Sequence, residues 1–560
     1  MTFRLALRPL SYPAALLVGA LLSTPVAAQL TIDTASPSTA ISGLTPDVPS
    51  FNMPTVDVER LLAEDALAVK GTPYRFGEAL PVEIDIKELG VVDVLPDGGH
   101  VYRLRITSPG AFSLGLGFST FDLPEGAGLW VHADDGEETY GAYSMLNNKA
   151  NREFAIQPLA GSALVLEYVE PEWVEFAGEV VVNQVVHDYR NAFGHKDAGY
   201  AGGSGSCNND VNCAVGAPWS NEIRASALII AGGVLCSGSL VNNTANDGTQ
   251  YFWTANHCGS MNNAVFRFNY EKSGCGSGGA PTNQTVQGST LIANNSNVDY
   301  RLVRITQAIP DSYDVYYQGF SRSTANPSNT IAIHHPSGDV KKISFDDDPA
   351  TKSGNQWKIS QWDDGVTEGG SSGSPLLDPN GRLIGQLCCG QATCGFPFND
   401  FYGRFDQAWN GVRAALDPLG NNPVFIDGFD PDFPGGGSGD WTSLGGGVGG
   451  LLGVPVLAGN GSLQAGATTN LVMSGGLPFG SSFFLLGGSA LNAPFKGGVL
   501  VPSLDVILSV GLSGSGGSTV SFAWPAGVPS GSQTWYQQWV VDSTAPQNFS
   551  GSNGVRGTTP

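Results

Sequence analysis

Three short motifs in this chain supply the side chains needed for nucleophilic acyl transfer. His257 lies in Thr254-Ala255-Asn256-His257-Cys258, Asp299 opens a strand-like run, and Ser372 lies in Gly370-Ser371-Ser372-Gly373. A serine hydroxyl is a weak nucleophile until an imidazole takes its proton, and a carboxylate must hold that imidazole in the correct tautomer. Together the motifs predict hydrolysis through a Ser-His-Asp triad and an acyl-enzyme intermediate.

The glycines that flank Ser372 have physical tasks. Gly370 lets the backbone turn its N–H toward a cleft, and Gly373 permits the tight bend that exposes the hydroxyl. We expect the amides of Gly370 and Ser372 to form an oxyanion hole, in which losing one donor costs roughly 3 kcal/mol. A flexible linker is the alternative. The strand-like runs that follow, ending at Leu377 and Leu387, favour a loop held between strands.

His257 and Asp299 each have a structural alternative. His257 follows the apolar run Tyr251 to Ala255 and could be a structural histidine beside a disulfide. The coincidence of three motifs favours catalysis. Asp299 has competitors because other aspartates also lie between His257 and Ser372. These competitors have polar, turn-like surroundings, where solvated aspartates are ordinary; they are Asp247, Asp311 and Asp314.

The composition bounds the fold class and the partners. The 560 residues include 76 glycines and 35 prolines but only 14% charged residues, which predicts a mainly β protein. Acidic residues outnumber basic ones 50 to 27, so the formal charge is −23. Such a charge repels nucleic acid and anionic lipid and attracts cationic polypeptides. We therefore expect polypeptide substrates and neither nucleic acid nor membrane as a partner.

The first 28 residues have the pattern of a signal peptide. Arg4 and Arg8 precede an apolar run from Ala14 to Leu22, and small residues precede Gln29. The run is too short to span a bilayer. A secreted protein is expected, either extracellular or periplasmic.

Composition changes divide the remaining chain. Residues 29–201 lack cysteine and carry alternating, strand-like stretches that predict a β-sandwich. All eight cysteines lie between Cys207 and Cys394, which predicts a disulfide-bearing domain over 202–430. A Gly/Pro linker over 431–440 leads to a Gly/Ser-rich region, 441–560, whose aromatic and aliphatic runs predict a small β domain.

Residues from about Gly202 to Asp430 resemble the lysyl endopeptidases, a bacterial branch of the chymotrypsin fold with two six-stranded β-barrels. The order His, Asp, Ser is the chymotrypsin order of the triad. The matching text is Ser204 to Asn208, Gly238 to Asp247, Ile331 to Pro336, Gly365 to Glu368, Gly385 to Leu387 and Phe425 to Gly428. The expected architecture is thus a chymotrypsin-like double β-barrel between an N-terminal β-sandwich-like pro-region and a small C-terminal β domain.

The resemblance also implies a substrate pocket. The trypsin-like position six residues before the nucleophile holds Val366, so trypsin's route to basic specificity is absent. Lysyl endopeptidases place the pocket carboxylate before a Tyr-Gly-Arg sequence, where this chain has Asp400. A buried carboxylate there would select a compact lysine ammonium over a guanidinium; a solvated loop aspartate is the alternative. Leu387 and Cys388 would also contribute to substrate binding.

The family disulfides, carried over by position, would be Cys207 to Cys394, Cys213 to Cys275, and Cys236 to Cys258. Two cysteines remain, Cys388 and Cys389. Such an adjacent pair either bonds through a strained ring or stays free. Cys388 also departs from the family, which has a histidine there stacked on a tryptophan. Trp357 and Trp362 are candidates for that tryptophan.

Activation is expected to involve the pro-region. Pancreatic-type proteases have an aspartate just before the nucleophile that pairs with a new N-terminus, and this chain has Ser371 there. Residues 29–201 are therefore interpreted as a pro-segment that aids folding or blocks the cleft. Lys196 precedes the expected mature start, and a lysine-cutting enzyme could release itself there. The C-terminal region could be a secretion signal, a carbohydrate or cell-surface binder, or a disposable extension.

Two other classes of function stay open. One is an inactive or differently specific secreted binding protein on the chymotrypsin fold. The other is a metal hydrolase built on His257, His334 and His335, which the absence of a HExxH helix and of a third plausible ligand disfavours. We expect no cofactor and no metal.

Overall fold

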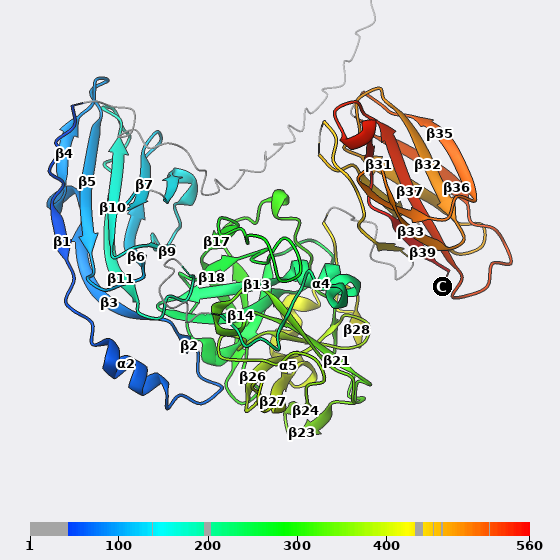
Figure 1. Cartoon of the computed structure of the whole chain (residues 1–560), viewed down its shortest axis with the longest axis horizontal. Helices are drawn as coiled ribbons and strands as arrows, with labels where there is room; N and C mark the ends of the chain where they lie inside the picture. Colours follow the sequence, from blue (N-terminus) through cyan, green and yellow to red (C-terminus); the bar gives the residue numbers. More distant parts are fainter. Residues whose placement is uncertain are drawn as a thin grey trace, which may run out of the picture.

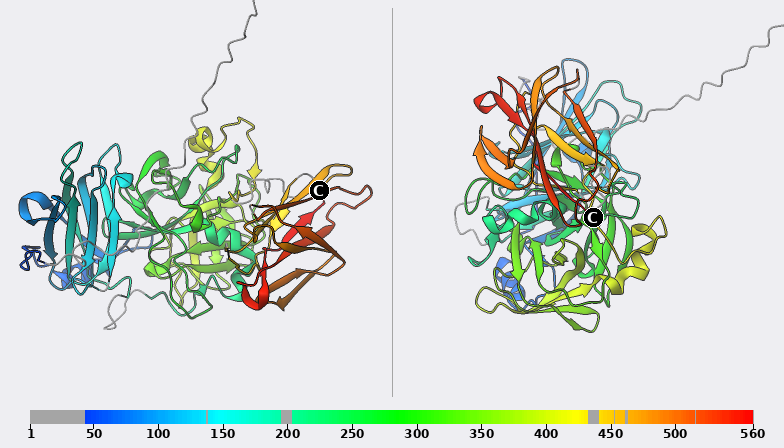
Figure 2. Two further views of the ribbon diagram at one scale, coloured as in Figure 1. Left: turned by 90° about the horizontal axis from the view of Figure 1, so that it is seen from above. Right: turned by 90° about the vertical axis from the view of Figure 1, so that its right-hand side faces the viewer.

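The structure, a computed structural model, describes residues 43–136, 138–194, 203–431, 441–451, 453–460, 463–514 and 516–559. The predicted signal peptide, Lys196 and the linker after Pro431 lie outside these ranges. The described chain forms three β-rich units, named here the N-terminal unit (43–194), the catalytic unit (203–431) and the C-terminal unit (441–559). The catalytic unit lies between the other two (Figures 1 and 2).

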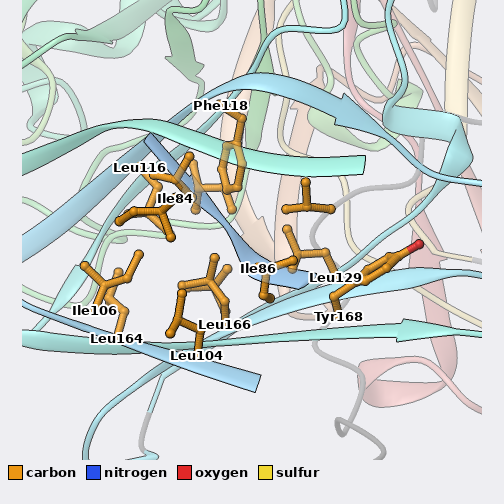
Figure 3. Close-up of a cluster of buried hydrophobic side chains, with 14 of the residues drawn as sticks. Ile84, Ile86, Leu104, Ile106, Leu116, Phe118, Leu129, Leu164, Leu166 and Tyr168 are labelled. Atoms are coloured by element: carbon orange, nitrogen blue, oxygen red, sulfur yellow. The ribbon is translucent and has the colours of Figure 1, made fainter. Parts of the chain in front are cut away.

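The N-terminal unit is a sandwich of two sheets. Alternating apolar residues from both sheets meet in one core, where Leu104, Leu116, Phe118 and Leu166 are almost fully buried (Figure 3). The six-stranded sheet contains β1 (Ser50–Asn52), β4 (Val91–Val94), β5 (His100–Thr107), β7 (Gly128–Ala133), β8 (Thr139–Tyr143) and β10 (Ala163–Glu170). The four-stranded sheet contains β3 (Gly77–Asp85), β6 (Ser113–Asp122), β9 (Phe154–Ala160) and β11 (Glu179–Asp188). The helices are α2 (Val58–Asp65) and α3 (Ile86–Leu89).

The first sheet of the catalytic unit carries His257 and Asp299 at the ends of neighbouring strands. Its strand order is β17-β16-β13-β14-β15-β19-β18, and β2 (Tyr74–Arg75) of the N-terminal unit pairs with β14. The bounds are β13 (Ser226–Ala231), β14 (Val234–Leu240), β15 (Tyr251–Ala255), β16 (Val265–Arg267), β17 (Thr285–Gln287), β18 (Ser289–Asn295) and β19 (Tyr300–Ile305).

The second sheet of the catalytic unit carries the Ser372 loop and Asp400. Its order is β12-β22-β21-β25-β26-β27-β24-β23, with β20 and β28 at one side. The bounds are β12 (Asn209–Asp210), β20 (Phe320–Ser321), β21 (Thr330–His334), β22 (Lys342–Asp346), β23 (Thr351–Ser353), β24 (Gln356–Gln361), β25 (Pro375–Leu377), β26 (Leu383–Gly390), β27 (Phe398–Arg404) and β28 (Phe425–Ile426). The helices of this unit are α4 (Ser220–Ala225) and α5 (Phe405–Leu416), with short turns η2 (Ala214–Trp219), η3 (Asn256–Cys258), η4 (Asp311–Tyr313) and η5 (Pro336–Gly338).

The C-terminal unit is a second, smaller β-sandwich. Trp441, Leu471, Phe484 and Tyr536 belong to its core. The larger sheet contains β29 (Trp441–Ser443), β32 (Ser481–Gly487), β35 (Val506–Gly511), β37 (Gln533–Val541), β38 (Phe549–Gly551) and β39 (Val555–Thr558). A three-stranded sheet contains β30 (Val456–Asn460), β31 (Thr468–Ser474) and β36 (Ser518–Ala523), and β33 (Ala490–Phe495) pairs with β34 (Gly498–Pro502).

The predicted fold class is confirmed. The described chain is mainly β, with a two-sheet catalytic unit of the chymotrypsin type flanked by a β-sandwich on the N-terminal side and a small β unit on the C-terminal side. Within the described residues no helix has both the length and the apolar character that crossing a bilayer requires.

A buried polar bridge joins the two sheets of the catalytic unit. The Trp253 indole on β15 donates to Gln386 Oε1 on β26 at 3.0 Å, and Gln386 Nε2 donates to the Val298 carbonyl at 2.9 Å. Trp253 and Gln386 are fully buried. Because buried polar groups must be paired, this bridge specifies how the histidine sheet docks on the serine sheet.

Replacing Gln386 by leucine should therefore destabilise the catalytic unit. Gln386→Leu leaves the Trp253 N–H and the Val298 carbonyl buried without a partner, which we expect to cost about 2–4 kcal/mol of unfolding free energy. Urea unfolding in the Ser372→Ala background, chosen to prevent self-digestion, measures this change. The exposed Gln407→Leu is the control, with an expected change of about 0.5 kcal/mol or less. An equal effect of both substitutions would contradict the bridge's role.

Candidate active site

The structure brings His257 and Asp299 into direct contact. His257 lies on η3, immediately after β15, and its Nδ1 is 2.6 Å from Asp299 Oδ2. The other carboxylate oxygen accepts the backbone N–H of His257 at 2.9 Å. Two bonds to one carboxylate fix both the position of the ring and the tautomer that carries its proton on Nδ1.

Strand pairing explains why Asp299, among the four candidate aspartates, reaches His257. Strands β15 and β19 are antiparallel, with Ala255 opposite Tyr300, so the residues next to this pair meet at the sheet end. Asp299 has φ +60, a left-handed conformation that turns the chain just before β19. The other candidates have different partners or surroundings: Asp247 accepts from Asn243 and Thr249, Asp314 pairs with Arg224, and Asp311 is exposed on η4.

Ser372 lies beside the histidine turn. Its carbonyl accepts the N–H of Ser237 at 2.8 Å and is 3.8 Å from Sγ of Cys258, the residue after His257. The side-chain nitrogen that faces away from Asp299, Nε2 of His257, is buried and has no hydrogen-bond partner among the described residues. The histidine therefore has an unoccupied acceptor position, which a general base requires.

The loop around Ser372 presents two unpaired amides. Within the described residues, neither the N–H of Gly370 nor that of Ser372 donates a hydrogen bond. The carbonyl of Gly369 accepts from Ser337 N, and the carbonyl of Ser371 accepts from Ser374 N at 2.9 Å. Since N–H and C=O of a trans peptide point in opposite directions, each bond turns the next amide outward.

Gly370 and Gly373 cannot be replaced freely in this loop. Both have positive φ values, +88 and +83. A Cβ at Gly370 would lie 2.9 Å from the His335 carbonyl, and one at Gly373 would overlap Thr254 Oγ1. The loop is therefore packed between neighbouring segments and is not a free linker.

A buried histidine supports Ser371, the residue before Ser372. His334 Nδ1 is 2.8 Å from Ser371 Oγ, and its Nε2 is 3.0 Å from Ser344 Oγ. Burial, with the nearby charges of Lys70 and Lys342, lowers the pKa of His334 to about 3. A neutral imidazole thus holds Ser371 by a hydrogen bond. At the position of Ser371, pancreatic-type proteases have an aspartate that forms an ion pair with the new N-terminus. The sequence had indicated His334 only as a weak metal-ligand candidate.

Asp400 lies on β27 and is fully buried. Its Oδ2 accepts from the Trp362 indole at 2.8 Å and from Thr367 Oγ1 at 2.6 Å. Its Oδ1 accepts from the Ala392 N–H at 3.2 Å. The alternative of a solvated loop aspartate does not fit this environment. The carboxylate needs a positive partner because unpaired burial of a charge is costly.

That partner is Lys70, a residue of the N-terminal unit that sequence analysis did not single out. Lys70 Nζ is 2.6 Å from Asp400 Oδ1, and it also donates to the carbonyls of Thr367 at 2.9 Å and Ala392 at 3.3 Å. The Lys70 side chain is only 11% exposed. Burial lowers the pKa of Lys70, and the charge of Asp400 opposes this shift.

Leu387 and Cys388, the other predicted substrate-binding residues, lie on β26. The Leu387 side chain packs in a core cluster with Trp357 and Tyr402, and its N–H donates to the Ser374 carbonyl at 3.0 Å. The Leu387 carbonyl accepts the N–H of Gly373 at 2.9 Å. Cys388 is bonded to Cys389, so the ring alternative for this adjacent pair is the one observed.

The other cysteines form the pairs that the resemblance implies. Cys207 bonds to Cys394, Cys213 to Cys275, and Cys236 to Cys258, with Cα atoms 5.6, 4.4 and 6.3 Å apart. The third bridge joins β14 to the turn that carries His257. Trp357 and Trp362, the candidates for the family's stacking tryptophan, are both buried; Trp357 donates to the Ile384 carbonyl and Trp362 to Asp400.

His257, His334 and His335, the candidate metal ligands, do not come together in one group of the described residues. In the described ranges the one group of side chains close enough to share an ion is Asp346, Asp348 and Asp363, which includes no histidine. His335 Nδ1 is 3.0 Å from the Asp339 carbonyl, whereas His334 contacts serines. The metal-hydrolase alternative therefore has no support in this geometry.

The neutral state of His334 predicts a pH dependence of stability. The unfolded chain protonates this histidine below about pH 6.5, while the folded chain does not until about pH 3. Unfolding free energy should fall by about 1.4 kcal/mol per pH unit between these values on account of this residue. Urea unfolding at pH 4, 5 and 6 measures the slope of unfolding free energy against pH. In the Ser372→Ala background, His334→Gln should reduce this slope by the contribution of about one proton.

Ser344→Ala serves as the matched control for this measurement. It removes one partner of His334 but keeps the titrating ring. It should therefore lower the unfolding free energy at every pH and leave the slope of unfolding free energy against pH unchanged. An unchanged slope in His334→Gln would contradict the assignment of a neutral buried ring.

Comparison with known proteins agrees with this geometry. Residues 201–403 match the family described as "Lysyl endopeptidase, C-terminal domain". A lysyl endopeptidase of Pseudomonas aeruginosa is 31% identical over 427 residues, which cover 69% of this chain and 89% of that protein. A thermostable serine protease, AL20, from an extremophilic microorganism matches at 16% identity and TM-score 0.27, covering 34% of this chain and 95% of its own. A Glu endopeptidase matches at 15% identity and TM-score 0.27, covering 35% of this chain and 91% of its own.

The relative from Pseudomonas aeruginosa decides the family, because most of its length aligns with this chain; the two solved structures are too distant by TM-score to add an argument. The chain accordingly belongs to the lysyl endopeptidase family and is a serine endopeptidase, with polypeptides as its substrates.

Proposed function

We propose that this endopeptidase cleaves peptide bonds after lysine. In the proposal Ser372 is the nucleophile, His257 the general base and Asp299 the residue that orients the imidazole. The amides of Gly370 and Ser372 form the oxyanion hole. Asp400 is the carboxylate at the base of the specificity pocket.

The ion pair between Lys70 and Asp400 carries the proposal of lysine specificity. A lysine of this chain already occupies the space that a substrate side chain would take, with Nζ 2.6 Å from Asp400 Oδ1. Its three acceptors, one carboxylate oxygen and two carbonyls, match the three donors of an ammonium group. The same contacts are available to the lysine of a substrate.

The arrangement of donors around Asp400 favours lysine over arginine. A guanidinium pairs best with a carboxylate when it donates to both oxygens at once. Here Oδ2 already accepts from Trp362 and Thr367, so only Oδ1 faces the pocket. A compact ammonium needs only that one oxygen.

The contact between His257 and Asp299 supports the usual order of proton transfers, although within the described residues no hydrogen bond joins Ser372 Oγ to His257 Nε2. Nδ1 of His257 is held by Asp299, so Nε2 is free to take the proton of Ser372 Oγ as it attacks the substrate carbonyl. The oxyanion that forms would accept from Gly370 and Ser372 N–H. The imidazolium then gives its proton to the leaving amine, and water hydrolyses the acyl-enzyme.

Several wider assignments belong to the same proposal. Secretion rests on the leader pattern of residues 1–28 and on four disulfides, which persist in oxidising compartments. The domain division at 202 and 430, the pro-region over 29–201 and a preference for cationic substrates are proposed from composition and charge. For the C-terminal unit, binding to a cell surface or carbohydrate is one candidate role.

Peptide mapping tests the nucleophile and the pocket together. A denatured protein digested by the purified enzyme should be cut after lysine, and the cuts should vanish with Ser372→Ala because the acyl-enzyme cannot form. Ser353→Ala, on the exposed strand β23, is the control and should cut normally. A serine-directed phosphonylating reagent should label the control but not Ser372→Ala. Cuts after arginine, glutamate or apolar residues would keep the nucleophile and discard the lysine pocket.

Asp400→Asn tests the pocket charge. It keeps the shape of the side chain and removes the partner of the substrate ammonium, so kcat/KM for a lysine substrate should fall about a hundredfold or more. The ratio of kcat/KM for lysine and alanine substrates measures the effect independently of the enzyme concentration. Asp348→Asn, an exposed residue, is the matched control. An unchanged ratio in Asp400→Asn would rule out this carboxylate as the specificity determinant.

A further inference from the structure

We infer that residues 65–77, named here the strap, keep the enzyme latent by placing Lys70 in the specificity pocket in a conformation that cannot be cleaved. The inference rests on the proposed lysine pocket and adds an intramolecular ligand that competes with substrate. In Figure 1 the strap leaves α2, reaches the catalytic unit near β26 and returns to β2.

Lys70 blocks the pocket completely. Its Nζ donates to Asp400 Oδ1, the oxygen that does not accept from Trp362 or Thr367, and to the carbonyls of Thr367 and Ala392. Asp400 is fully buried beneath it. A substrate lysine cannot bind until Lys70 leaves, because the two ammonium groups require the same acceptors.

The backbone around Lys70 is bent, not extended. The Thr72 N–H donates to the Val69 carbonyl at 3.2 Å, and Thr72 Oγ1 donates to the same oxygen at 2.8 Å. Gly71 has φ +112. Lys70 and Gly71 are therefore the central residues of a tight turn, with glycine at the position where a turn needs positive φ.

A turn is a poor substrate conformation. Peptides that bind along a sheet edge or cleft do so as extended strands, whose main chain pairs with the protein. The bond from Thr72 to Val69 uses the backbone groups that an extended strand would offer to the enzyme. The strap thus offers the side chain that the pocket selects without laying the Lys70–Gly71 peptide bond in an extended path across the Ser372 loop.

The pocket side of the strap also fits closely at Gly71. A Cβ added to Gly71 would lie 3.1 Å from the Cys388 carbonyl and 3.1 Å from Cys389 Cβ. The turn therefore rests directly on the bonded cysteine pair of β26, and a larger residue at 71 would be strained both by φ and by contact.

Two anchors hold the turn in place. After the turn, Tyr74 pairs with Leu235 and Arg75 with Val234, and the amides of Phe76 and Gly77 donate to the Gly233 carbonyl. Before the turn, Asp65 accepts from Arg190 at 2.6 Å, from Arg75 at 2.8 Å and from Tyr189 at 2.5 Å. The anchors lie on both sides of Lys70, so the lysine is presented at high effective concentration.

The N-terminal unit also covers the catalytic unit on the side of His257. His257 and Gly259 line a cavity of about 490 Å³ whose opposite wall includes Gly115, Pro158 and Gln184 of the N-terminal unit. A long polypeptide therefore meets an obstacle on both sides of the nucleophile. The strap supplies the obstacle on the pocket side.

Binding of a fluorescent peptide that ends in lysine tests the inference without using activity. All proteins are the full chain in the Ser372→Ala background, and anisotropy gives the affinity. The parent should bind the peptide weakly. Lys70→Gln should bind it at least tenfold more tightly because the pocket is empty. Arg60→Gln, an exposed change on α2, is the control and should bind like the parent.

A third protein distinguishes a failure of the proposed lysine pocket from a failure of the inferred latency. Adding Asp400→Asn to Lys70→Gln should abolish the gained affinity. If this protein binds as tightly as Lys70→Gln alone, the lysine pocket itself is wrong. Another outcome is that the parent binds the peptide as tightly as Lys70→Gln does, with Asp400→Asn weakening that binding. This result would support the lysine pocket at Asp400 and contradict the inference that Lys70 keeps the enzyme latent. Lys70→Met, which keeps the apolar stem, replaces Lys70→Gln if the latter fails to fold by circular dichroism.

The bent conformation has a separate readout in the active protein. Intact mass measurement during maturation should find the Lys70–Gly71 bond uncut in the first processed form. Early cleavage after Lys70 would show that the strap is a substrate and would overturn this part of the inference.

Discussion

A buried carboxylate that requires a cation is the constraint on which the rest of this structure depends. Asp400 has no access to solvent, and its donors other than Lys70 are all neutral groups: an indole, a hydroxyl and an amide. Leaving such a charge unmatched costs several kcal/mol. The pocket is therefore stable when an ammonium fills it. In this chain the ammonium comes from Lys70, and in our proposal a substrate lysine later takes its place.

In our proposals the same electrostatic demand links lysine specificity to latency. A pocket that selects lysine through one open carboxylate oxygen also accepts a lysine of its own chain, provided the chain can reach it. The strap reaches it because β2 adds to the edge of β14 while Asp65 is held by Arg190 and Tyr189. Backbone pairing and ion pairs in the N-terminal unit thus determine the occupancy of a site in the catalytic unit.

The serine loop is organised by neutral hydrogen bonds. Ser371 is held by His334, the Gly370 carbonyl accepts from Ser237 Oγ, and the Gly369 carbonyl accepts from Ser337 N. Each of these bonds exists with the N-terminal unit still attached. In our proposal the oxyanion hole is thus formed while the N-terminal unit is attached, so activity is controlled by access and not by assembly, which fits a blocking strap.

Residue types and local patterns were sufficient for the fold class, and they also supplied the residues of the proposed triad. The glycines around Ser372, the apolar strand before His257 and the strand that Asp299 opens are local features, because backbone bends and strand alternation depend on neighbours in the chain. Asp299 was separable from three other aspartates by its surroundings. The contacts of Lys70, Trp362 and Thr367 with Asp400 could not be predicted in this way, because these residues converge on Asp400 from segments up to 330 positions apart.

What the amino-acid sequence by itself determined is the mainly β fold class and the cysteine-bearing unit, both of which follow from short-range pattern and composition. Only the tertiary structure decided which lysine enters the pocket, which histidine stays neutral beneath the serine loop, and that the adjacent cysteines bond to each other. The reason is that burial and hydrogen-bond partners depend on long-range packing, and no spacing along the chain records them.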